Sequence, residues 1–196
     1  MKAILFDMDG VLIDTHDAWF AVLNATMKKF GKEELSEEIY NEKAWAQPFE
    51  IVKEKFLPEI DANDIADSYA KEFNNFSHKI KVLPNVEETL AELKKKYKLV
   101  VISNSYHELV EKHLTGVNLL KYFDLILGGD EVKNGKPEPD LIIEACKKIN
   151  VDIKDVAIVG DTILDIEAGK AAGCKTIGYK VDAEKRIEDF GELLPC

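Results

Sequence analysis

Ala3-Ile4-Leu5-Phe6-Asp7-Met8-Asp9-Gly10 is an apolar run that leads directly into two carboxylates and a glycine. A short apolar run bounded by a turn residue is typical of a strand buried on both faces, as in a parallel sheet. Side chains alternate along an extended strand, so Asp7 and Asp9 should point to the same side. Two carboxylates this close repel unless a cation or a shared proton relieves the repulsion. The stretch predicts either a site at a strand end or an exposed turn, and the downstream sequence decides between them.

Beyond residue 80, apolar strand patterns alternate with amphipathic helical patterns. The expected strands cover residues 3–6, 99–102, 125–127, 156–159 and 174–179, and the expected helices cover 86–97, 106–114, 141–149 and 163–172. Strands that alternate with helices of this length form right-handed crossovers and a parallel sheet covered on both faces. The predicted fold class is therefore α/β, with a doubly wound, Rossmann-like parallel sheet.

An all-helical segment is expected between the first strand and the rest of this sheet. Apolar residues recur at helical spacing through residues 16–77, with Gly31 as a C-cap, Ser36 as an N-cap, and a third helix that begins near Pro48. We expect an α/β core formed by residues 1–15 and 80–196, and an inserted helical domain formed by residues 16–79. No repeat or long linker interrupts either part.

The composition excludes several classes of function. Acidic residues outnumber basic ones 37 to 26, for a net charge of −11, which argues against a nucleic-acid partner. Arg186 is the one arginine, so anion recognition must use lysine, backbone amides or a metal. No apolar run is long enough for a membrane span and no signal peptide is recognisable, so we expect a cytoplasmic protein without a membrane partner. The oligomeric state can be a monomer or a homodimer, and the sequence does not decide between them.

The cysteines do not indicate a disulfide framework or a zinc site. The three, Cys146, Cys174 and Cys196, are far apart, and no Cys-x-x-Cys pair occurs. Cys146 and Cys174 have apolar neighbours and are expected to be small core residues.

Polar residues follow several of the expected strands. Asp7 and Asp9, Ser103-Asn104, and Asp161 stand at carboxyl ends, and Lys136 precedes a helix. In open α/β sheets ligands bind beyond these ends, so the side chains should converge. Carboxylates without histidine or cysteine favour Mg²⁺, which commonly bridges protein carboxylates to a phosphate.

The remaining groups at this edge fit a phosphoryl group. The hydroxyl and amides of Ser103-Asn104 suit a phosphoryl oxygen, and Lys136 can supply a positive charge. Asp165 lies four residues after Asp161 and shares its helix face, so it can orient the metal ligands. The pattern predicts metal-assisted phosphoryl transfer.

At this point the chain resembles the haloacid dehalogenase-like hydrolases. The resemblance rests on four motifs in order: Phe6-Asp7-Met8-Asp9-Gly10-Val11-Leu12-Ile13-Asp14-Thr15, Ile102-Ser103-Asn104, Gly135-Lys136-Pro137-Glu138-Pro139-Asp140 and Gly160-Asp161-Thr162-Ile163-Leu164-Asp165. The helical segment is similar to the cap of the phosphoglycolate phosphatase and β-phosphoglucomutase branch. The resemblance implies a Mg²⁺-dependent phosphatase that hydrolyses a small phosphorylated metabolite.

The resemblance also implies a role for each motif residue. Asp7 would attack phosphorus and become an aspartyl-phosphate. Asp9 would protonate the leaving alcohol and later deprotonate the attacking water, so its pKa should be raised by neighbouring carboxylates.

The implied metal and phosphate ligands complete the site. Asp7, the backbone carbonyl of Asp9, and Asp161 would hold Mg²⁺, with Asp165 as a further ligand or as a support for the others. The phosphoryl group would be held by Ser103, Asn104 and Lys136.

Three alternatives to a phosphatase are open to comparison with these motifs. A sugar phosphomutase is favoured by Asp9-Gly10-Val11 and Asp14-Thr15, which resemble the first motif of β-phosphoglucomutase. That family uses a cap histidine where this chain has Trp19, and a cap arginine that is absent from residues 16–79. Asp9 argues against a dehalogenase. A non-enzymatic, phospho-accepting or binding domain would show no sustained turnover.

Overall fold

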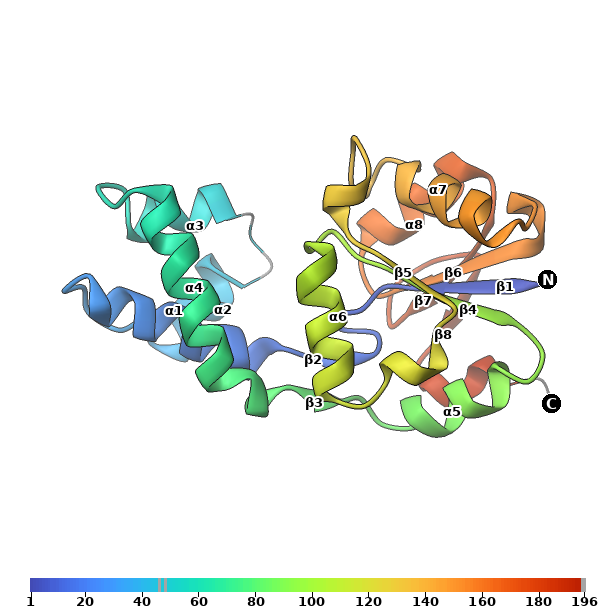
Figure 1. Cartoon of the computed structure of the whole chain (residues 1–196), viewed down its shortest axis with the longest axis horizontal. Helices are drawn as coiled ribbons and strands as arrows, with labels where there is room; N and C mark the ends of the chain where they lie inside the picture. Colours follow the sequence, from blue (N-terminus) through green and yellow to red (C-terminus); the bar gives the residue numbers. More distant parts are fainter. Residues whose placement is uncertain (46, 48, 195–196) are drawn as a thin grey trace. The chain divides into compact units, whose positions relative to one another are not determined.

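The computed structural model describes residues 1–45, 47 and 49–194. It divides the chain into two compact units: Met1–Asp14 with Lys81–Cys196 form one, here called the core unit, and Thr15–Ile80 form the other, here called the helical unit. Figure 1 shows both units coloured along the chain. Since the core unit contains both the first strand and the later ones, the helical unit is an insertion into it.

The core unit is built on a six-stranded parallel sheet. Its strands are β1 (Ala3–Phe6), β4 (Lys98–Ile102), β5 (Leu125–Leu127), β6 (Val156–Gly160), β7 (Lys175–Tyr179) and β8 (Lys185–Ile187). Their order is β5-β4-β1-β6-β7-β8, and every neighbouring pair is parallel. This confirms the predicted doubly wound α/β class. The sequence did not predict β8, because its short Lys-Arg-Ile pattern lacks the apolar signal of a buried strand.

Helices cover both faces of this sheet. The longer helices are α5 (Val86–Leu93), α6 (His107–Gly116), α7 (Asp140–Ile149) and α8 (Ile163–Ala172), joined by short 3₁₀ turns η2 (Leu120–Tyr122), η3 (Gly129–Glu131), η4 (Ile153–Asp155) and η5 (Phe190–Leu193). Figure 1 shows α7 and α8 on one side of the sheet and α5 on the other.

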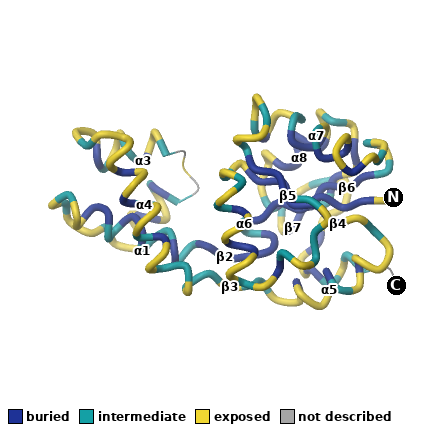
Figure 2. The backbone as a smooth tube through the Cα atoms, viewed as in Figure 1, coloured by how far each residue is buried: buried dark blue, intermediate teal, exposed yellow. Residues whose placement is uncertain are grey.

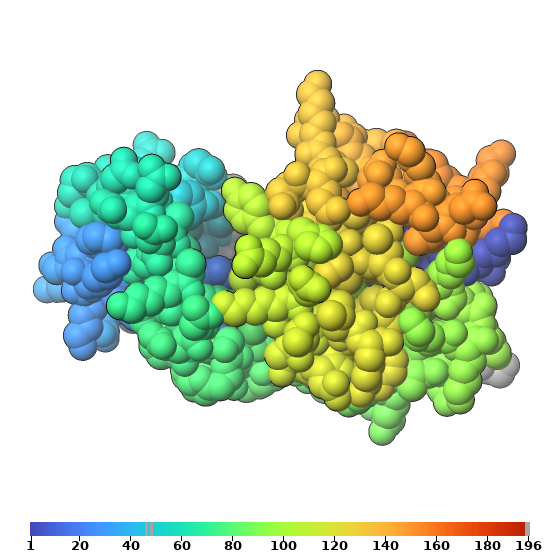
Figure 3. Space-filling view, viewed as in Figure 1, coloured from blue at the N-terminus to red at the C-terminus, as the bar shows by residue number. Residues whose placement is uncertain are grey.

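The alternation of side chains along each strand fills both layers of the core. Leu5, Val100 and Ile158 belong to the apolar cluster that includes residues of α7 and α8. Phe6 points to the opposite face, where its ring contacts Phe123 and Phe190. β1 and β6 are buried along their length, and β4 is buried from Leu99 to Ile102 (Figure 2). In Figure 3 the segment from α6 to η2, yellow-green to yellow, covers the core unit on the face shown.

The helical unit contains α1 (His16–Lys29), α2 (Glu37–Lys43), α3 (Phe49–Phe56), α4 (Ala62–Phe76) and the 3₁₀ turn η1 (Ser77–Lys79). The predicted N-cap is confirmed, because the Ser36 side chain accepts a hydrogen bond from Ile39 N. The C-cap of α1 is Phe30, and Gly31, expected in that place, is the next residue, with φ +72°. Pro48, near which the third helix was expected to begin, lies outside the described residues. The unit has its own apolar cluster, which includes Leu23, Val52 and Ile65.

A short antiparallel ladder pairs the segments by which the chain leaves and re-enters the core unit. β2 (Ile13–Asp14) pairs antiparallel with β3 (Lys81–Val82). This pairing was not predicted, because two residues are too few to show strand periodicity. Cys146 and Cys174 are buried in the core, as expected, and Cys196 lies outside the described part of the chain. Among the described helices, none has the length and apolar character that a membrane crossing requires.

His113 on α6 is a buried group whose pKa depends on the fold. It is 2% exposed, and burial, followed by the charge of Lys112, lowers its pKa from 6.5 to about 4. Below pH 6.5 the unfolded chain therefore binds a proton that the folded protein does not bind until about pH 4, so stability falls as the pH falls through this window. Between pH 8 and pH 5 this histidine should cost about 2 kcal/mol.

Urea unfolding of His113→Asn at both pH values tests this expectation. The variant should lose about 2 kcal/mol less than the wild type on acidification. His107→Asn, on the same helix but half exposed, is the control for the loss of an imidazole from α6. Equal acid sensitivity of His113→Asn and the wild type would show that another group is responsible.

Candidate active site

The carboxyl ends of β1, β4 and β6 lie together at one edge of the sheet. Phe6 is level with Val101 of β4 and Val159 of β6, and Asp7 N donates to Val159 O at 2.9 Å. Because β4 and β5 lie on one side of β1 and β6 to β8 on the other, the winding direction changes at β1. Ligands of doubly wound sheets bind at this point, so the register places the residues after β1, β4 and β6 around it.

Three carboxylates gather at this edge. Oxygen atoms of Asp7, Asp161 and Asp165 all lie within 4.8 Å of one another. Asp7 follows β1, Asp161 follows β6, and Asp165 lies in the first turn of α8. Asp161 Oδ1 is buried and accepts no hydrogen bond from the described residues. An unpartnered carboxylate oxygen on a member of an acidic cluster indicates a place for a cation.

The amine of Lys136 lies between two of these carboxylates. Its Nζ donates to Asp7 Oδ1 and to Asp165 Oδ1, both at 2.6 Å. The exposed fractions of the three side chains are 4% for Lys136, 12% for Asp7 and 0% for Asp165. A buried cation shared by two carboxylates offsets much of the repulsion between them.

Burial shifts the proton equilibria of this cluster. Burial, together with the charge of Asp165, raises the pKa of Asp161 to about 6. Burial also raises the pKa of Asp7, against the opposing effect of the Lys136 ammonium. For Lys136 burial alone would lower the pKa, but Asp7 and Asp165 outweigh it and the pKa is raised. The cluster therefore holds excess negative charge that a further cation would relieve.

The carboxylate of Asp165 is already engaged on both oxygens. Oδ1 accepts from Lys136, and Oδ2 accepts from Thr162 N at 3.1 Å and Thr162 Oγ1 at 2.6 Å. The strand end packs closely on it, because a Cβ at Gly160 would lie 2.1 Å from Asp165 Cβ. The sequence left Asp165 open as a metal ligand or as a support for the metal ligands. Both of its oxygens are already hydrogen-bonded, and its contact with Lys136 is one that neither role had included.

Thr162 is a residue whose contribution the sequence analysis missed. It forms a capping box with Asp165 at the start of α8. The signal was present in the pattern Thr-x-x-Asp at a helix start. Within the motif of residues 160–165, the sequence alone assigns no role to Thr162.

Asp9 lies in the turn that follows the first strand, outside the three-carboxylate cluster. It is half buried. Burial and the charge of Asp165 raise the pKa of both Asp7 and Asp161, and the charge of Asp9 adds a smaller effect in the same direction. The turn needs a glycine: Gly10 has φ +76°, and a Cβ there would lie 2.0 Å from Asp161 Oδ2. Asp9 is thus close enough to act on the same centre without being part of the cluster.

Ser103 and Asn104 follow β4 but make different contacts. Ser103 is buried, and its Oγ accepts from Ser105 N at 3.1 Å, which leaves the hydroxyl hydrogen available to donate. Asn104 is exposed, and its side chain bonds to the backbone of Lys136. The structure therefore brings Asn104 and Lys136 together and places Ser103 at the adjacent strand end.

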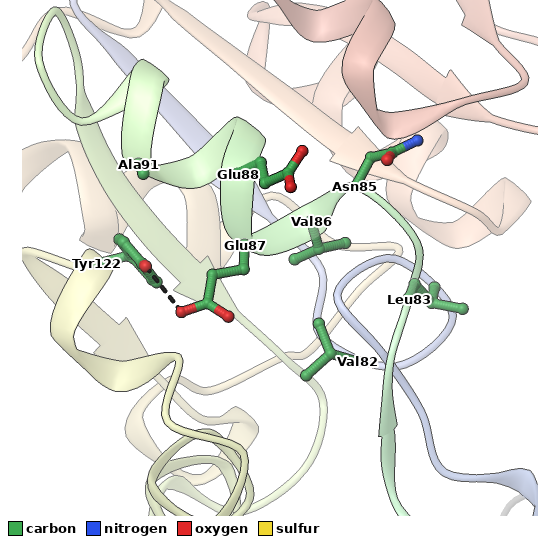
Figure 4. A pocket seen from close by; sticks show the side chains of 8 residues that line it. All are labelled: Val82, Leu83, Asn85, Val86, Glu87, Glu88, Ala91 and Tyr122. Carbon is green, nitrogen blue, oxygen red and sulfur yellow. Dashed lines mark hydrogen bonds between the residues drawn. The ribbon is translucent and has the colours of Figure 1, made fainter.

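A hollow elsewhere on the core unit does not share this chemistry. It has a volume of about 450 Å³, and its described lining residues are Val82, Leu83, Asn85, Val86, Glu87, Glu88, Ala91 and Tyr122. Figure 4 shows the Tyr122 hydroxyl bonded to Glu87, which also receives Lys121 Nζ. Glu87 is thus paired, and none of the eight lining residues belongs to the predicted site.

The sequence as a whole matches a known family. The family model described as haloacid dehalogenase-like hydrolase matches residues 4–179. A phosphoglycolate phosphatase from Aquifex aeolicus is 37% identical over 97% of this chain and 91% of its own length. A phosphorylated carbohydrates phosphatase from Thermotoga maritima is 30% identical over 90% of this chain and 84% of its own length.

The fold has close counterparts among solved structures. A hydrolase of the same superfamily from Geobacter sulfurreducens superposes with a TM-score of 0.81 over 98% of this chain and 94% of its own, at 24% sequence identity. At that identity the likeness shows the fold alone.

Proposed function

The chain belongs to the haloacid dehalogenase-like hydrolase family and is a phosphatase of that family; from this premise we propose that it hydrolyses a small phosphorylated metabolite, with Mg²⁺ as cofactor and an aspartyl-phosphate on Asp7 as intermediate. The observation that carries the proposal is the arrangement around Asp7. Lys136 holds its Oδ1, and the unpartnered oxygen of Asp161 lies in the same carboxylate cluster. A nucleophile held between a fixed ammonium and a cation site is suited to phosphoryl transfer.

The donor set fits a hard divalent cation. Carboxylate oxygens of Asp7 and Asp161 are close together, and the Asp161 oxygen has no hydrogen-bond donor among the described residues. We assign Asp7, Asp161 and the backbone carbonyl of Asp9 as the ligands, with Asp165 in support. When bound, Mg²⁺ would neutralise charge on the phosphoryl oxygens and on the nucleophile.

In the first half of the proposed mechanism Asp7 is the nucleophile. Lys136 fixes Oδ1, so the carboxylate keeps one orientation and its other oxygen remains to attack phosphorus. The Ser103 hydroxyl and the Lys136 ammonium would stabilise charge on the transferring phosphoryl group. Asp165 keeps Lys136 in place from the opposite side.

In both halves Asp9 moves the proton. It would donate to the leaving oxygen during attack and then accept a proton from the water that cleaves the phosphoryl–Asp7 bond. Its position after the strand, outside the carboxylate cluster, is compatible with facing the leaving group while Asp7 faces phosphorus. We expect Asp9 to carry a proton at the start of the cycle.

The relatives suggest which compounds to test. Phosphoglycolate and phosphorylated carbohydrates, named for the two relatives above, are small phosphoric monoesters. We propose a substrate of this class and a cytoplasmic location, where such metabolites occur. Residues 16–79 are proposed to act as a cap domain that selects the substrate, with residues 1–15 and 80–196 as the catalytic core.

A screen of phosphorylated compounds tests the proposal. Phosphate release is measured from phosphoglycolate, several sugar phosphates and an aryl phosphate, with Mg²⁺ or with a chelator. Turnover should require Mg²⁺ and should be absent from Asp7→Asn. Chelator-resistant turnover would contradict the cofactor, and conversion of a sugar 1-phosphate to its 6-phosphate without phosphate release would identify a mutase.

Gly10→Ala should lower the affinity for Mg²⁺, an effect beyond the small loss of folding stability that any alanine with this φ causes. The added Cβ would meet Asp161 Oδ2 and displace a proposed ligand. We expect Mg²⁺ affinity, measured by titration of activity, to fall about 10- to 100-fold.

Gly31→Ala is the matched control for this substitution. Gly31 has φ +72°, nearly that of Gly10, but nothing lies within 4 Å of its added Cβ. Both variants should lose about 1 kcal/mol of stability from backbone strain. Unchanged Mg²⁺ affinity in Gly10→Ala would mean that Asp161 is not a ligand.

A further inference from the structure

The side-chain amide of Asn104 pairs with the backbone of Lys136 in both directions. Asn104 Nδ2 donates to Lys136 O at 3.0 Å, and Lys136 N donates to Asn104 Oδ1 at 2.8 Å. The Asn104 amide therefore makes the two hydrogen bonds with Lys136 that a residue of a neighbouring β-strand would make. Its position in the sequence, directly after Ser103, had suggested that it binds the phosphoryl group. One N–H of Nδ2 remains for another acceptor.

The backbone of Lys136 is not held by a helix or a strand. It lies in the segment between η3 and α7, which has no regular secondary structure from Val132 to Pro139. Its side chain must nevertheless keep Nζ 2.6 Å from both Asp7 and Asp165. The two hydrogen bonds from the Asn104 side chain to the backbone N and O of Lys136 restrict the position of the Lys136 Cα, from which that side chain extends.

The chain is shaped to admit this amide. A Cβ at Gly135 would lie 2.6 Å from Asn104 Oδ1, so only glycine allows the segment to come so close. A Cβ at Gly129 would likewise lie 2.6 Å from Asn104 O. Glycines from two positions thus pack against Asn104, on its side chain and on its backbone.

We infer that Asn104 is a positioning residue whose side chain fixes the backbone of Lys136, so that the Lys136 amine stays between the nucleophile Asp7 and Asp165. The consequence for turnover rests on the proposed function, whereas the positioning itself rests on the contacts above. Asn104 acts through Lys136 and does not contact the phosphoryl group with its side chain.

Amine labelling tests the positioning without any assay of activity. Wild type and Asn104→Ala are treated with trace acetic anhydride, and acetylation of each lysine is quantified by peptide mass spectrometry. Labelling of Lys136 relative to Lys98, whose Nζ donates to Ile149 O, should rise about 10-fold or more when the two hydrogen bonds are lost. Unchanged relative labelling of Lys136 would overturn the inference.

Asn134→Ala is the matched control. Asn134 is an asparagine in the same segment, and its amide and backbone N–H bond to Asp140 Oδ2. Its loss should leave the relative labelling of Lys136 and kcat within about twofold of the wild type. If Asn134→Ala raised Lys136 labelling as much as Asn104→Ala, general loosening of the segment would explain both and the inference would fail.

A double-mutant cycle separates positioning from direct contact with the phosphoryl group. Asn104→Ala should lower kcat about 10- to 30-fold with little change in KM, because two hydrogen bonds are lost. In a Lys136→Met background the same substitution should change kcat less than about threefold, since the group it positions is gone. An equal loss in both backgrounds would show that Asn104 acts on the substrate directly.

A failure of the proposed function and a failure of the role inferred for Asn104 would give different results. Where Lys136→Met does not fold, the labelling experiment decides alone. Absence of phosphate release by the wild type from every compound would contradict the proposed function, while the labelling of Lys136 would still confirm or overturn the role of Asn104.

Discussion

Asp7→Asn should reduce kcat for phosphate release at least about 10⁴-fold. The asparagine side chain has nearly the same size and can still accept a hydrogen bond from Lys136, but its amide is not a nucleophile towards phosphorus. The loss should appear with every substrate, and added Mg²⁺ should not restore it. Initial rates with an aryl phosphate measure the effect.

The control for Asp7→Asn is a carboxylate at the opposite edge of the sheet. Asp155, which precedes β6, pairs with Lys2 at 2.7 Å, so Asp155→Asn also removes a carboxylate from a lysine. It should leave kcat within about twofold and the protein folded. If Asp7→Asn retained more than a tenth of wild-type kcat while folded, Asp7 would not be the nucleophile.

Lys136→Met should destabilise the metal-free protein by about 3–5 kcal/mol. The substitution removes the cation that lies 2.6 Å from both Asp7 and Asp165, and leaves two buried carboxylates facing each other. Urea unfolding at neutral pH in the presence of a chelator measures the loss. Turnover should also fall, because the ammonium that orients Asp7 is absent.

A compensating variant distinguishes charge repulsion from loss of packing. Asp165→Asn in the Lys136→Met background removes one of the two carboxylates, so stability should recover by about 2 kcal/mol without recovery of turnover. Lys98→Met, which removes a lysine bonded to the Ile149 carbonyl, should cost about 1 kcal/mol or less. A loss in Lys136→Met no larger than in Lys98→Met would mean that the buried pair does not stabilise the fold.

The main elements of the core unit could be predicted because their signals are local. The apolar runs that become β1, β4 and β6 are continuous, as strands buried on both faces must be, and each strand is followed directly by a polar residue. Caps such as Ser36 are equally local. Convergence of Asp7 and Asp161 followed from a general rule about strand ends, and the cluster of their carboxylates agrees with it.

What could not be predicted depends on partners far away in the sequence. β8 is identified by its pairing with β7, since Lys185, Arg186 and Ile187 have no strand periodicity of their own. Asn104 and Lys136 are 32 residues apart, and no pattern in either segment shows that an amide of one bonds to the backbone of the other. The sequence indicated which kinds of side chain form the site, but it did not indicate which of these side chains bond to one another.

The central claim, that Asp7 becomes phosphorylated, is tested most directly by trapping the intermediate. Asp9→Asn removes the proposed base for the second step, while an aryl phosphate has a leaving group that needs little protonation, so the phosphorylated protein should accumulate. The protein is quenched in acid during turnover with Mg²⁺, and the phosphoryl group is located by mass spectrometry. We predict one phosphoryl group, on Asp7. A phosphoryl group on any other residue, or release of phosphate by Asp9→Asn with no phosphorylated protein at any time, would contradict the account.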